Sequence, residues 1–446
     1  MSGVDHLPSE EYRRSARRSP GSRLCLRAHQ HLVSTCPQCG EGWGELGHKL
    51  QGLVLQELAA APPLTPPAEP HPDDLPGSDE AVDRLATQAA GIRRRRRRAK
   101  KQLSELRQLA AARRADKVRG AYRRFRSRLL AELLIEEARA VVRNAPDEAH
   151  SFASLVPLVL DWAQSEEHAA WAPTLIARAA AHQANALRVA GELAAAERIF
   201  DQLDVRDVGD VAVRGEILSL EGSLRSDQRK FEMAETVLQR AAEAYEYAGD
   251  RLGVAKVRIQ QGILMRVLCR TEEVLRHFEA AASDLGEEAA PELAVATTTG
   301  RVNALCDLGR PLEARRVLHA GLDAFEEIEA PFVAAHFRTL EGRISLGLAD
   351  YSAAEDYFRA AIATMQIVGR PHDAATTSLL LAEVLLEQGR AAELRRLASG
   401  LIKEFQEREV GREIFKALQL FGKAVATEQL TATILERIRR TFLNAT

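Results

Sequence analysis

The sequence predicts an all-α protein that consists mainly of consecutive helical hairpins. Ala, Leu, Glu and Arg, which are strong helix formers, dominate the composition, and aromatic residues make up only 5%. Clusters of β-branched and aromatic residues with turn signals every ~8 to 12 residues, which indicate an all-β protein, are missing. In the C-terminal part, similar segments recur with a period close to 40 residues. Such self-similarity is typical of a helical-repeat solenoid.

The overall composition sets the class of protein. The chain has 446 residues, of which 46% are hydrophobic and 28% charged, as expected for a soluble globular protein with a large core. Met1 to Arg18 carry charges but no apolar signal region, and no uncharged run approaches the ~20 residues that span a bilayer. We therefore expect a cytoplasmic protein with no membrane partner. Five cysteines, an odd number, argue against a disulfide framework.

Residues 1–58 are expected to form a small N-terminal unit whose main feature is a CxxC motif within residues 20–45. Cys36 and Cys39 are two residues apart on one tight turn, and His31 precedes them at the end of a short predicted helix. Thiolate and imidazole are the preferred ligands of structural zinc. We expect one zinc ion per chain, with a reduced, metal-free CxxC turn as the alternative.

Three ligands leave a tetrahedral zinc site one ligand short. Cys25 or His29 is the local candidate, and His6 or a residue of a partner chain also remains possible. The segment resembles the zinc-binding knuckle of bacterial anti-sigma factors over about Leu24 to Trp43. The family pattern has three residues between the histidine and the first cysteine, whereas four separate His31 from Cys36. The resemblance implies a sigma factor or another transcription regulator as partner.

Residues 59–81 are expected to be a linker, because seven prolines crowd between Pro62 and Pro76. Proline removes a backbone donor and fixes φ, so such a stretch is semi-extended rather than helical. The linker separates the N-terminal unit from everything downstream.

Residues 82–117 are expected to form a basic helical arm. Between Ile92 and Arg128 the chain has 17 Lys and Arg but only Glu105 and Asp116, whereas the whole chain has a net charge of −2. Six consecutive arginines lie within the arm: Arg93, Arg94, Arg95, Arg96, Arg97 and Arg98. Such a run indicates an acidic partner. The candidates are nucleic-acid phosphate, the acidic remainder of the chain, and an acidic protein surface.

Residues 118–446 are expected to form the solenoid, because one position recurs at the end of successive apolar-periodic runs. These six positions, called slots here, are Gly191, Arg229, Cys269, Gly309, Ala349 and Gly389. We expect each slot to end the first helix of a hairpin in the left-handed conformation, where glycine is most favourable. Arg229 and Cys269 are imperfect versions of that position.

Two further columns keep the same register. Seven residues before each slot stand mostly small residues, which let helices cross closely: Ala184, Gly222, Gly262, Val302, Gly342 and Ala382. Nine residues after the slot stand large apolar ones: Phe200, Leu238, Phe278, Leu318 and Phe358, with Ala398 breaking the column. We expect the small column to allow two helices to cross closely and the large column to supply the apolar side chain that packs there.

This pattern of small residue, Gly turn, Ala and Phe resembles the tetratricopeptide repeat over about Ala169 to Glu409. The family repeat is ~34 residues long, so about six hairpins of ~40 residues, with capping helices at both ends, are an extended variant. The resemblance implies a binding groove on the concave face. Its polar part consists of Asn185, Arg188, Arg266, Asn303 and Arg343, and Leu346 and Leu386 make its other end apolar.

The expected function follows from the repeats, because no phosphate-binding loop, zinc-protease helix, nucleophile elbow or strand-borne dinucleotide motif occurs. We therefore expect no enzyme, but a regulatory adaptor that binds a protein or peptide in the solenoid groove. The alternative is a nucleic-acid-associated protein, in which Arg93–Arg98 and the zinc knuckle hold the nucleic acid and the repeats recruit a protein.

Overall fold

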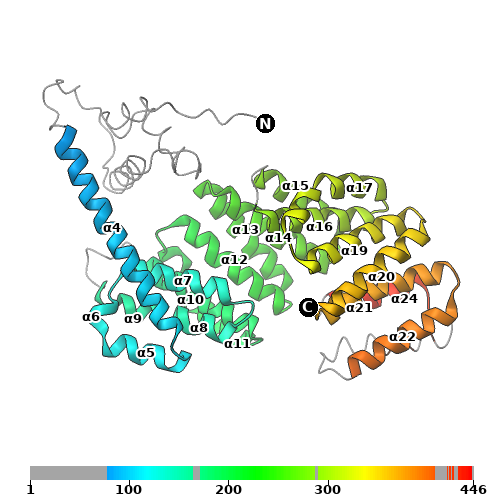
Figure 1. Ribbon diagram of the computed structural model, residues 1–446, viewed down its shortest axis with the longest axis horizontal. Helices are drawn as coiled ribbons and strands as arrows, with labels where there is room; N and C mark the ends of the chain where they lie inside the picture. The colour runs from blue at the N-terminus through cyan, green and yellow to red at the C-terminus, as the bar shows by residue number, and fades with distance from the viewer. Residues whose placement is uncertain are drawn as a thin grey trace. The chain divides into compact units, whose positions relative to one another are not determined.

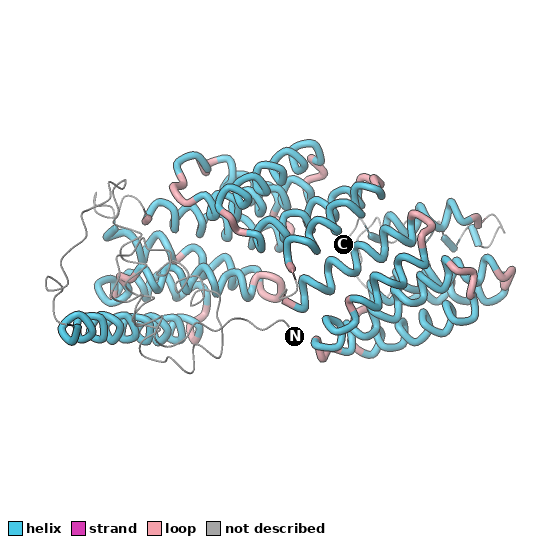
Figure 2. The backbone as a smooth tube through the Cα atoms, turned by 90° about the horizontal axis from the view of Figure 1, so that it is seen from above, coloured by secondary structure: helices cyan, strands magenta, loops and turns pink. Residues whose placement is uncertain are grey.

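A computed structural model describes most of the chain downstream of the linker. The described residues are 78–163, 171–286, 290–406 and 430–443, together with 419, 421, 422, 424 and 425. Throughout these ranges the secondary structure is helical and contains no strand (Figure 2), which confirms the all-α prediction. No helix in the described ranges is long and apolar enough to cross a membrane. The predicted zinc ligands Cys25, His31, Cys36 and Cys39 lie outside the described residues.

The chain divides into two compact units. The first comprises Met1–Glu136 and Pro157–Trp162, and the second Glu137–Val156 and Ala163–Thr446. The expected boundary between arm and solenoid, at residue 118, falls inside a helix of the first unit.

In the first unit, a long helix packs through one stripe onto the helices that follow it. These helices are α4 (Ser78–Arg107), α5 (Ala111–Gly120) and α6 (Tyr122–Phe125). On α4, Ala99, Leu103 and Leu106 are buried, at the helical spacing that lines one face. The buried Arg114 of α5 donates from Nε to the carbonyl of Leu106 at 2.9 Å. That bond satisfies a carbonyl at the end of α4, where no intrahelical donor is available.

The second unit contains six consecutive helical hairpins, as the repeat register predicted (Figure 1). Two helices, α7 (Arg128–Val141) and α9 (Val156–Leu160), cross from one unit to the other, and α8 (Pro146–Ser154) precedes the hairpins. The first helices of the hairpins are α10 (Ala172–Val189), α12 (Val211–Asp227), α14 (Arg251–Val267), α16 (Pro291–Asp307), α19 (Pro331–Gly347) and α21 (Pro371–Glu387). The second helices are α11 (Leu193–Asp201), α13 (Phe231–Ala248), α15 (Thr271–Leu285), α17 (Pro311–Ala320) with α18 (Leu322–Glu327), α20 (Tyr351–Ile367) and α22 (Ala391–Gln406). The last described helix is α24 (Ala432–Leu443).

All six slots adopt the left-handed conformation, which confirms the register. The three glycines have φ between 66° and 86°, and Arg229, Cys269 and Ala349 have φ of 59°, 60° and 59°. The residue after each slot donates its backbone N–H to the carbonyl five residues back, at 2.8 to 3.0 Å. This is the Schellman arrangement that satisfies the carbonyls at a helix C-terminus. The turn is therefore retained in each hairpin even where a side chain makes the left-handed conformation costly.

The helices cross closely at the small residues, as predicted, and there the small and large columns meet. A Cβ added to Gly342 would lie 2.5 Å from Cε1 of Phe358, and one added to Gly262 would lie 2.7 Å from Cε2 of Phe278. Phe278 also packs against Gly300 of the next hairpin, where an added Cβ would lie 2.4 Å from its ring. Each ring thus fills space that a side chain on the glycine would occupy, and the helices approach closely there.

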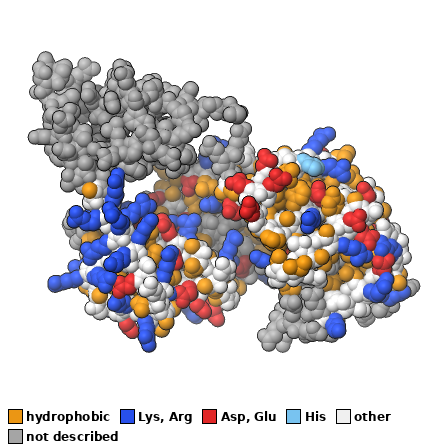
Figure 3. Space-filling view, in the orientation of Figure 1, with side chains coloured by type: hydrophobic (Ala, Val, Ile, Leu, Met, Phe, Trp, Pro, Cys, Tyr) orange, Lys and Arg blue, Asp and Glu red, His pale blue; other side chains and the backbone are white. Residues whose placement is uncertain are grey.

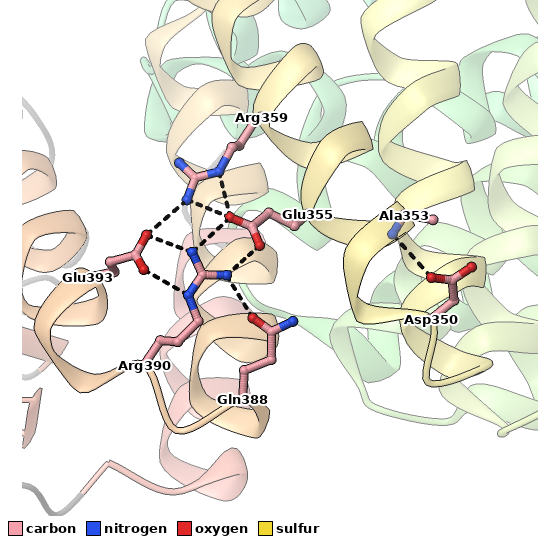
Figure 4. Close-up of polar contacts among 7 residues, drawn as sticks. All are labelled: Asp350, Ala353, Glu355, Arg359, Gln388, Arg390 and Glu393. Carbon is pink, nitrogen blue, oxygen red and sulfur yellow. Dashed lines mark hydrogen bonds and ion pairs between the residues drawn. The ribbon is translucent and has the colours of Figure 1, made fainter.

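At three of the junctions between successive hairpins, an ion pair joins the start of one second helix to the second helix before it. The residue after a slot pairs with the glutamate six residues after the preceding slot, as in Lys230–Glu197, Arg270–Glu235 and Arg390–Glu355. Figure 4 shows the last of these junctions, where Arg390 also donates to Glu393 at 2.7 Å and to the side-chain oxygen of Gln388 at 2.7 Å. The first two pairs are exposed and the last is partly buried, so each of the exposed pairs contributes little to stability.

Candidate protein-binding face

The first helices of the hairpins form one continuous polar surface, which we call the first-helix face. Hydrogen bonds join several neighbouring pairs of first helices along it: α10 with α12, α12 with α14, α16 with α19, and α19 with α21. Ser219 of α12 donates to Gln260 of α14 at 2.8 Å, and Thr299 of α16 lies 3.2 Å from His336 of α19. These contacts link helices about 40 residues apart in sequence, so residues three and six before each slot come to lie on this surface.

At the N-terminal end of the face, two predicted groove residues contact each other. Arg188 donates from Nε to Oδ1 of Asn185 at 3.0 Å and from Nη1 to Asp227 at 2.6 Å. Asn185 is buried, so its amide holds Arg188 in place and is not presented to solvent. Arg188 remains partly exposed, but its charge is already paired with Asp227.

The middle of the face carries a denser cluster in which Asp307 is the central carboxylate. Arg343 donates to Asn303 and, at 2.5 Å, to Asp307. Arg439, from α24, also donates to Asp307 at 3.4 Å. The C-terminal helix therefore reaches a residue 132 positions earlier in the chain. Three helices, α16, α19 and α24, build this cluster.

The ionisation of the cluster follows from its burial and charges. Burial would raise the pKa of Asp307, but Arg343 and Arg439 lower it below its usual value, so the carboxylate is ionised. Burial would lower the pKa of Arg343, but Asp307 raises it. Burial raises the pKa of the Cys306 thiol, which is therefore protonated and contributes no charge at neutral pH.

Arg266 differs from the other arginines of the face. Its side chain is exposed, and it makes no hydrogen bond or ion pair with any described residue. Burial nevertheless lowers its pKa, Asp307 raises it, and Arg343 lowers it further. An accessible guanidinium that is also partly desolvated lies among surrounding protein atoms and is not extended into bulk water. Within the part of the chain that the structure describes, Arg266 is thus an exposed cation without a hydrogen-bond or ion-pair partner.

An exposed apolar side chain lies beside Arg266. Ile263, one turn earlier on α14, is 43% exposed and belongs to the same helix face. The predicted apolar end of the groove is less accessible than Ile263, because Leu346 and Leu386 are partly buried against the core of the last hairpins. The structure therefore places the accessible apolar side chain next to the unpaired cation, in the middle of the face.

A second polar cluster lies in the interior between α10 and α12. Glu216 accepts from Arg178 Nε at 2.6 Å and lies 3.0 Å from Nε2 of the buried His182. Burial would raise the pKa of Glu216, but His182 and Arg178 lower it to about 2. Tyr245 packs between two glycines nearby, where an added Cβ on Gly253 would lie 2.3 Å from its ring. Since its members satisfy one another, this cluster serves the packing of the first hairpins.

Several functional candidates were missed by reasoning from the sequence. Asp227 and Asp307 both stand two residues before a slot, and that shared position was the available signal. Arg439 gave no signal, because it lies outside the repeats. Arg93–Arg98 belong to α4 in the first unit and are not part of the first-helix face.

Comparison with known proteins supports the fold. No family model and no curated protein matches the chain. Among solved structures, a Rap protein complexed with Competence and Sporulation Factor matches 69% of this chain and 85% of its own, with a TM-score of 0.52 and 16% identity. The apo form of RapI matches with a TM-score of 0.49 and 12% identity, over 69% of this chain and 85% of its own. Aspartyl phosphate phosphatase F from Bacillus subtilis matches with a TM-score of 0.44 and 14% identity, over 70% and 83%. The first of these likenesses shows that the chain shares a helical-repeat solenoid fold with a Rap protein.

Proposed function

We propose that this chain is an adaptor that binds another protein through the first-helix face, with Arg266 as the anchoring cation. The observation that carries the proposal is the state of Arg266, which is exposed, partly desolvated and without a hydrogen-bond partner among the described residues. A Rap protein of similar fold was solved in complex with Competence and Sporulation Factor. A fold that accommodates a bound factor is consistent with an adaptor role for this chain.

The chemistry around Arg266 indicates which group the partner presents. An arginine binds a carboxylate through two parallel N–H···O bonds, which gives both energy and orientation. Asp307 raises the pKa of Arg266 more than Arg343 lowers it, so the attraction for an added carboxylate would come from the guanidinium of Arg266 itself. Ile263 offers an apolar contact one turn away. We therefore propose a segment that carries a carboxylate next to an apolar side chain.

The N-terminal unit would give the adaptor a second function. Zinc bound by His31, Cys36 and Cys39, with Cys25 or His29 as a further ligand, remains our proposal from the sequence. A sigma factor or another transcription regulator as partner is likewise a proposal, since it depends on the resemblance of that segment to anti-sigma factors.

The test starts from a random peptide library that is displayed with free C-termini and selected against the full chain. The affinity of a selected peptide is then measured by fluorescence anisotropy for the unchanged protein and for Arg266→Ala. Truncation of a desolvated arginine anchor should weaken binding at least ~10-fold, which corresponds to about 1.4 kcal/mol. Arg276→Ala is the matched control, because Arg276 is an exposed arginine on α15, outside the first-helix face.

Two peptide variants separate the sources of the carboxylate. C-terminal amidation removes only the terminal charge, and replacement of Asp or Glu by Asn or Gln removes only the side-chain charge. One of the two should lower the affinity for the unchanged protein and have little effect on Arg266→Ala. If Arg266→Ala binds every selected peptide as tightly as the unchanged protein, the first-helix face is not the binding site.

A further inference from the structure

The arginine segment of α4, Arg93 to Arg98, has charge on all sides of the helix. Successive residues of an α-helix are ~100° apart, so six consecutive residues cover more than a full turn. All six arginines are exposed. A helix packed against a protein surface would bury at least one of them. The described residues therefore leave this stretch of α4 open around its whole circumference.

From Ala99 onward, one face of α4 is buried. Ala99, Leu103 and Leu106 are buried, and α4 packs onto the rest of the first unit. Arg98, the last arginine of the segment, donates to the carbonyl of Arg124 at 3.3 Å. The arginine segment is thus a direct extension of a packed helix, so its position is held without burying its charges.

Between residues 92 and 128 the cations far outnumber the anions, with 17 Lys and Arg against 2 acidic residues. Of the 17 Lys and Arg between residues 92 and 128, only Arg114 is buried. Glu105 is already paired with Lys117 and Arg124, and Asp116 with Arg119. Nine cations make no hydrogen bond or ion pair with the described residues: Arg93, Arg94, Arg95, Arg96, Arg97, Lys100, Lys101, Arg113 and Arg123.

This arrangement does not favour folding. Arginines three and four apart on a helix repel each other, and the segment contains several such pairs without interleaved acids. A polyanion that neutralises them removes the repulsion and releases its own counterions. Figure 3 shows Lys and Arg side chains gathered where α4, α5 and α6 lie in Figure 1. The excess charge is therefore available to a ligand with many negative charges.

We propose that the arginine segment of α4 binds duplex DNA by lying in its major groove and contacting the phosphates on both sides. An α-helix with its side chains is ~10 to 12 Å wide, and the major groove of B-form DNA is ~12 Å wide. Charge around the whole helix reaches both walls of such a groove. The major groove of A-form RNA is deep and narrow, and does not admit a helix in this way. The contact is made by charge and does not depend on base sequence.

The experiment measures binding of the full chain to a fluorescent duplex DNA of about one to two helical turns at several salt concentrations. The variant replaces Arg93 to Arg98 by Gln. The matched control replaces six exposed arginines of the second unit by Gln, and so loses the same charge: Arg198, Arg240, Arg276, Arg315, Arg316 and Arg396. Circular dichroism confirms that both remain helical.

Each phosphate contact contributes about −0.9 to the slope of log K against log salt. If half of the six arginines contact phosphate, the slope of the variant should be less steep by about 2.7, while the control keeps the slope of the unchanged protein. An unchanged slope in the variant, or an equal loss in the control, would overturn the proposal. Binding of polyglutamate or duplex RNA as tight as that of duplex DNA at the same salt would also overturn it, and would identify the partner as an acidic protein or an RNA.

Discussion

The packing of Phe358 against Gly342 allows the closest test of how the hairpins are held together. Gly342→Ala adds one methyl group, and its Cβ would lie 2.5 Å from Cε1 of Phe358. Carbon atoms in contact are ordinarily ~3.5 to 4.0 Å apart, so about 1 Å must be gained by movement. Phe358 is fully buried, and protein interiors are close-packed, so its ring can move only by displacing neighbouring side chains. Overpacking of this kind costs roughly 1 to 3 kcal/mol, beyond the small gain from replacing a helical glycine.

A glycine in the same unit offers a control substitution that should change the free energy of unfolding in the opposite direction. Gly400 lies within α22, and an added Cβ there meets no atom within 4 Å. Gly400→Ala should therefore stabilise the protein by roughly 0.5 to 1 kcal/mol through helix propensity alone. Phe358→Leu removes the ring edge that Gly342→Ala would strike, so the double variant should lose less stability than the sum of the two single changes.

The assay is urea unfolding followed by circular dichroism, with the midpoints compared at constant slope. If Gly342→Ala stabilises the protein as much as Gly400→Ala does, the close approach of the helices at Gly342 is refuted. Strict additivity of Gly342→Ala and Phe358→Leu would equally contradict the direct contact between them.

Three further predictions follow. Ala349→Gly should stabilise the protein by roughly 0.5 to 1 kcal/mol, and Gly389→Ala should destabilise it by about 1 kcal/mol. The reason is that a Cβ in the left-handed conformation costs more free energy than the extra conformational freedom of glycine in the unfolded chain. Urea midpoints that shift in the same direction for the two variants would contradict this prediction. Since the pKa of Glu216 is lowered from 4.5 to about 2, its stabilisation is fully present above pH 4.5 and is lost as the pH falls toward 2. Glu216→Gln should therefore cost about 3 kcal/mol at pH 7 and nothing near pH 2, and a cost independent of pH would rule out an ionic role. Cys36→Ser with Cys39→Ser should abolish zinc binding without changing the melting of the repeats, as measured by elemental analysis and calorimetry; a full zinc content in the double variant would exclude these ligands.

The repeat register was predictable because its determinants are local. A left-handed turn, a small residue seven positions earlier and a large one nine positions later recur along the sequence, and each is required by the geometry of a single hairpin. Even Arg229 and Cys269, which do not look like turn residues, were located by spacing and have φ of 59° and 60°. Periodicity thus outweighed the residue type at these positions.

The organisation of the first-helix face was less predictable, because it depends on contacts between distant residues. Asn185 was expected to face a ligand, but it is buried and holds Arg188. Asp307 and Arg439 are brought together across 132 positions by a helix outside the repeats, and no periodic pattern encodes that contact. Such contacts decide which of the predicted cations lacks a partner among the described residues, so the structure distinguishes Arg266 from Arg343 where the sequence does not.

Site-specific photocrosslinking in the native host cell would show whether a protein partner binds at the first-helix face. A benzophenone amino acid is introduced at Ile263, which is 43% exposed beside Arg266, or at Ile367, which is 85% exposed at the end of a second helix. Position 263 should give a crosslinked protein partner that disappears when Arg266→Ala is added, and position 367 should give none. A partner crosslinked from position 367 and absent at position 263 would show that binding occurs on the second helices and not on the first-helix face.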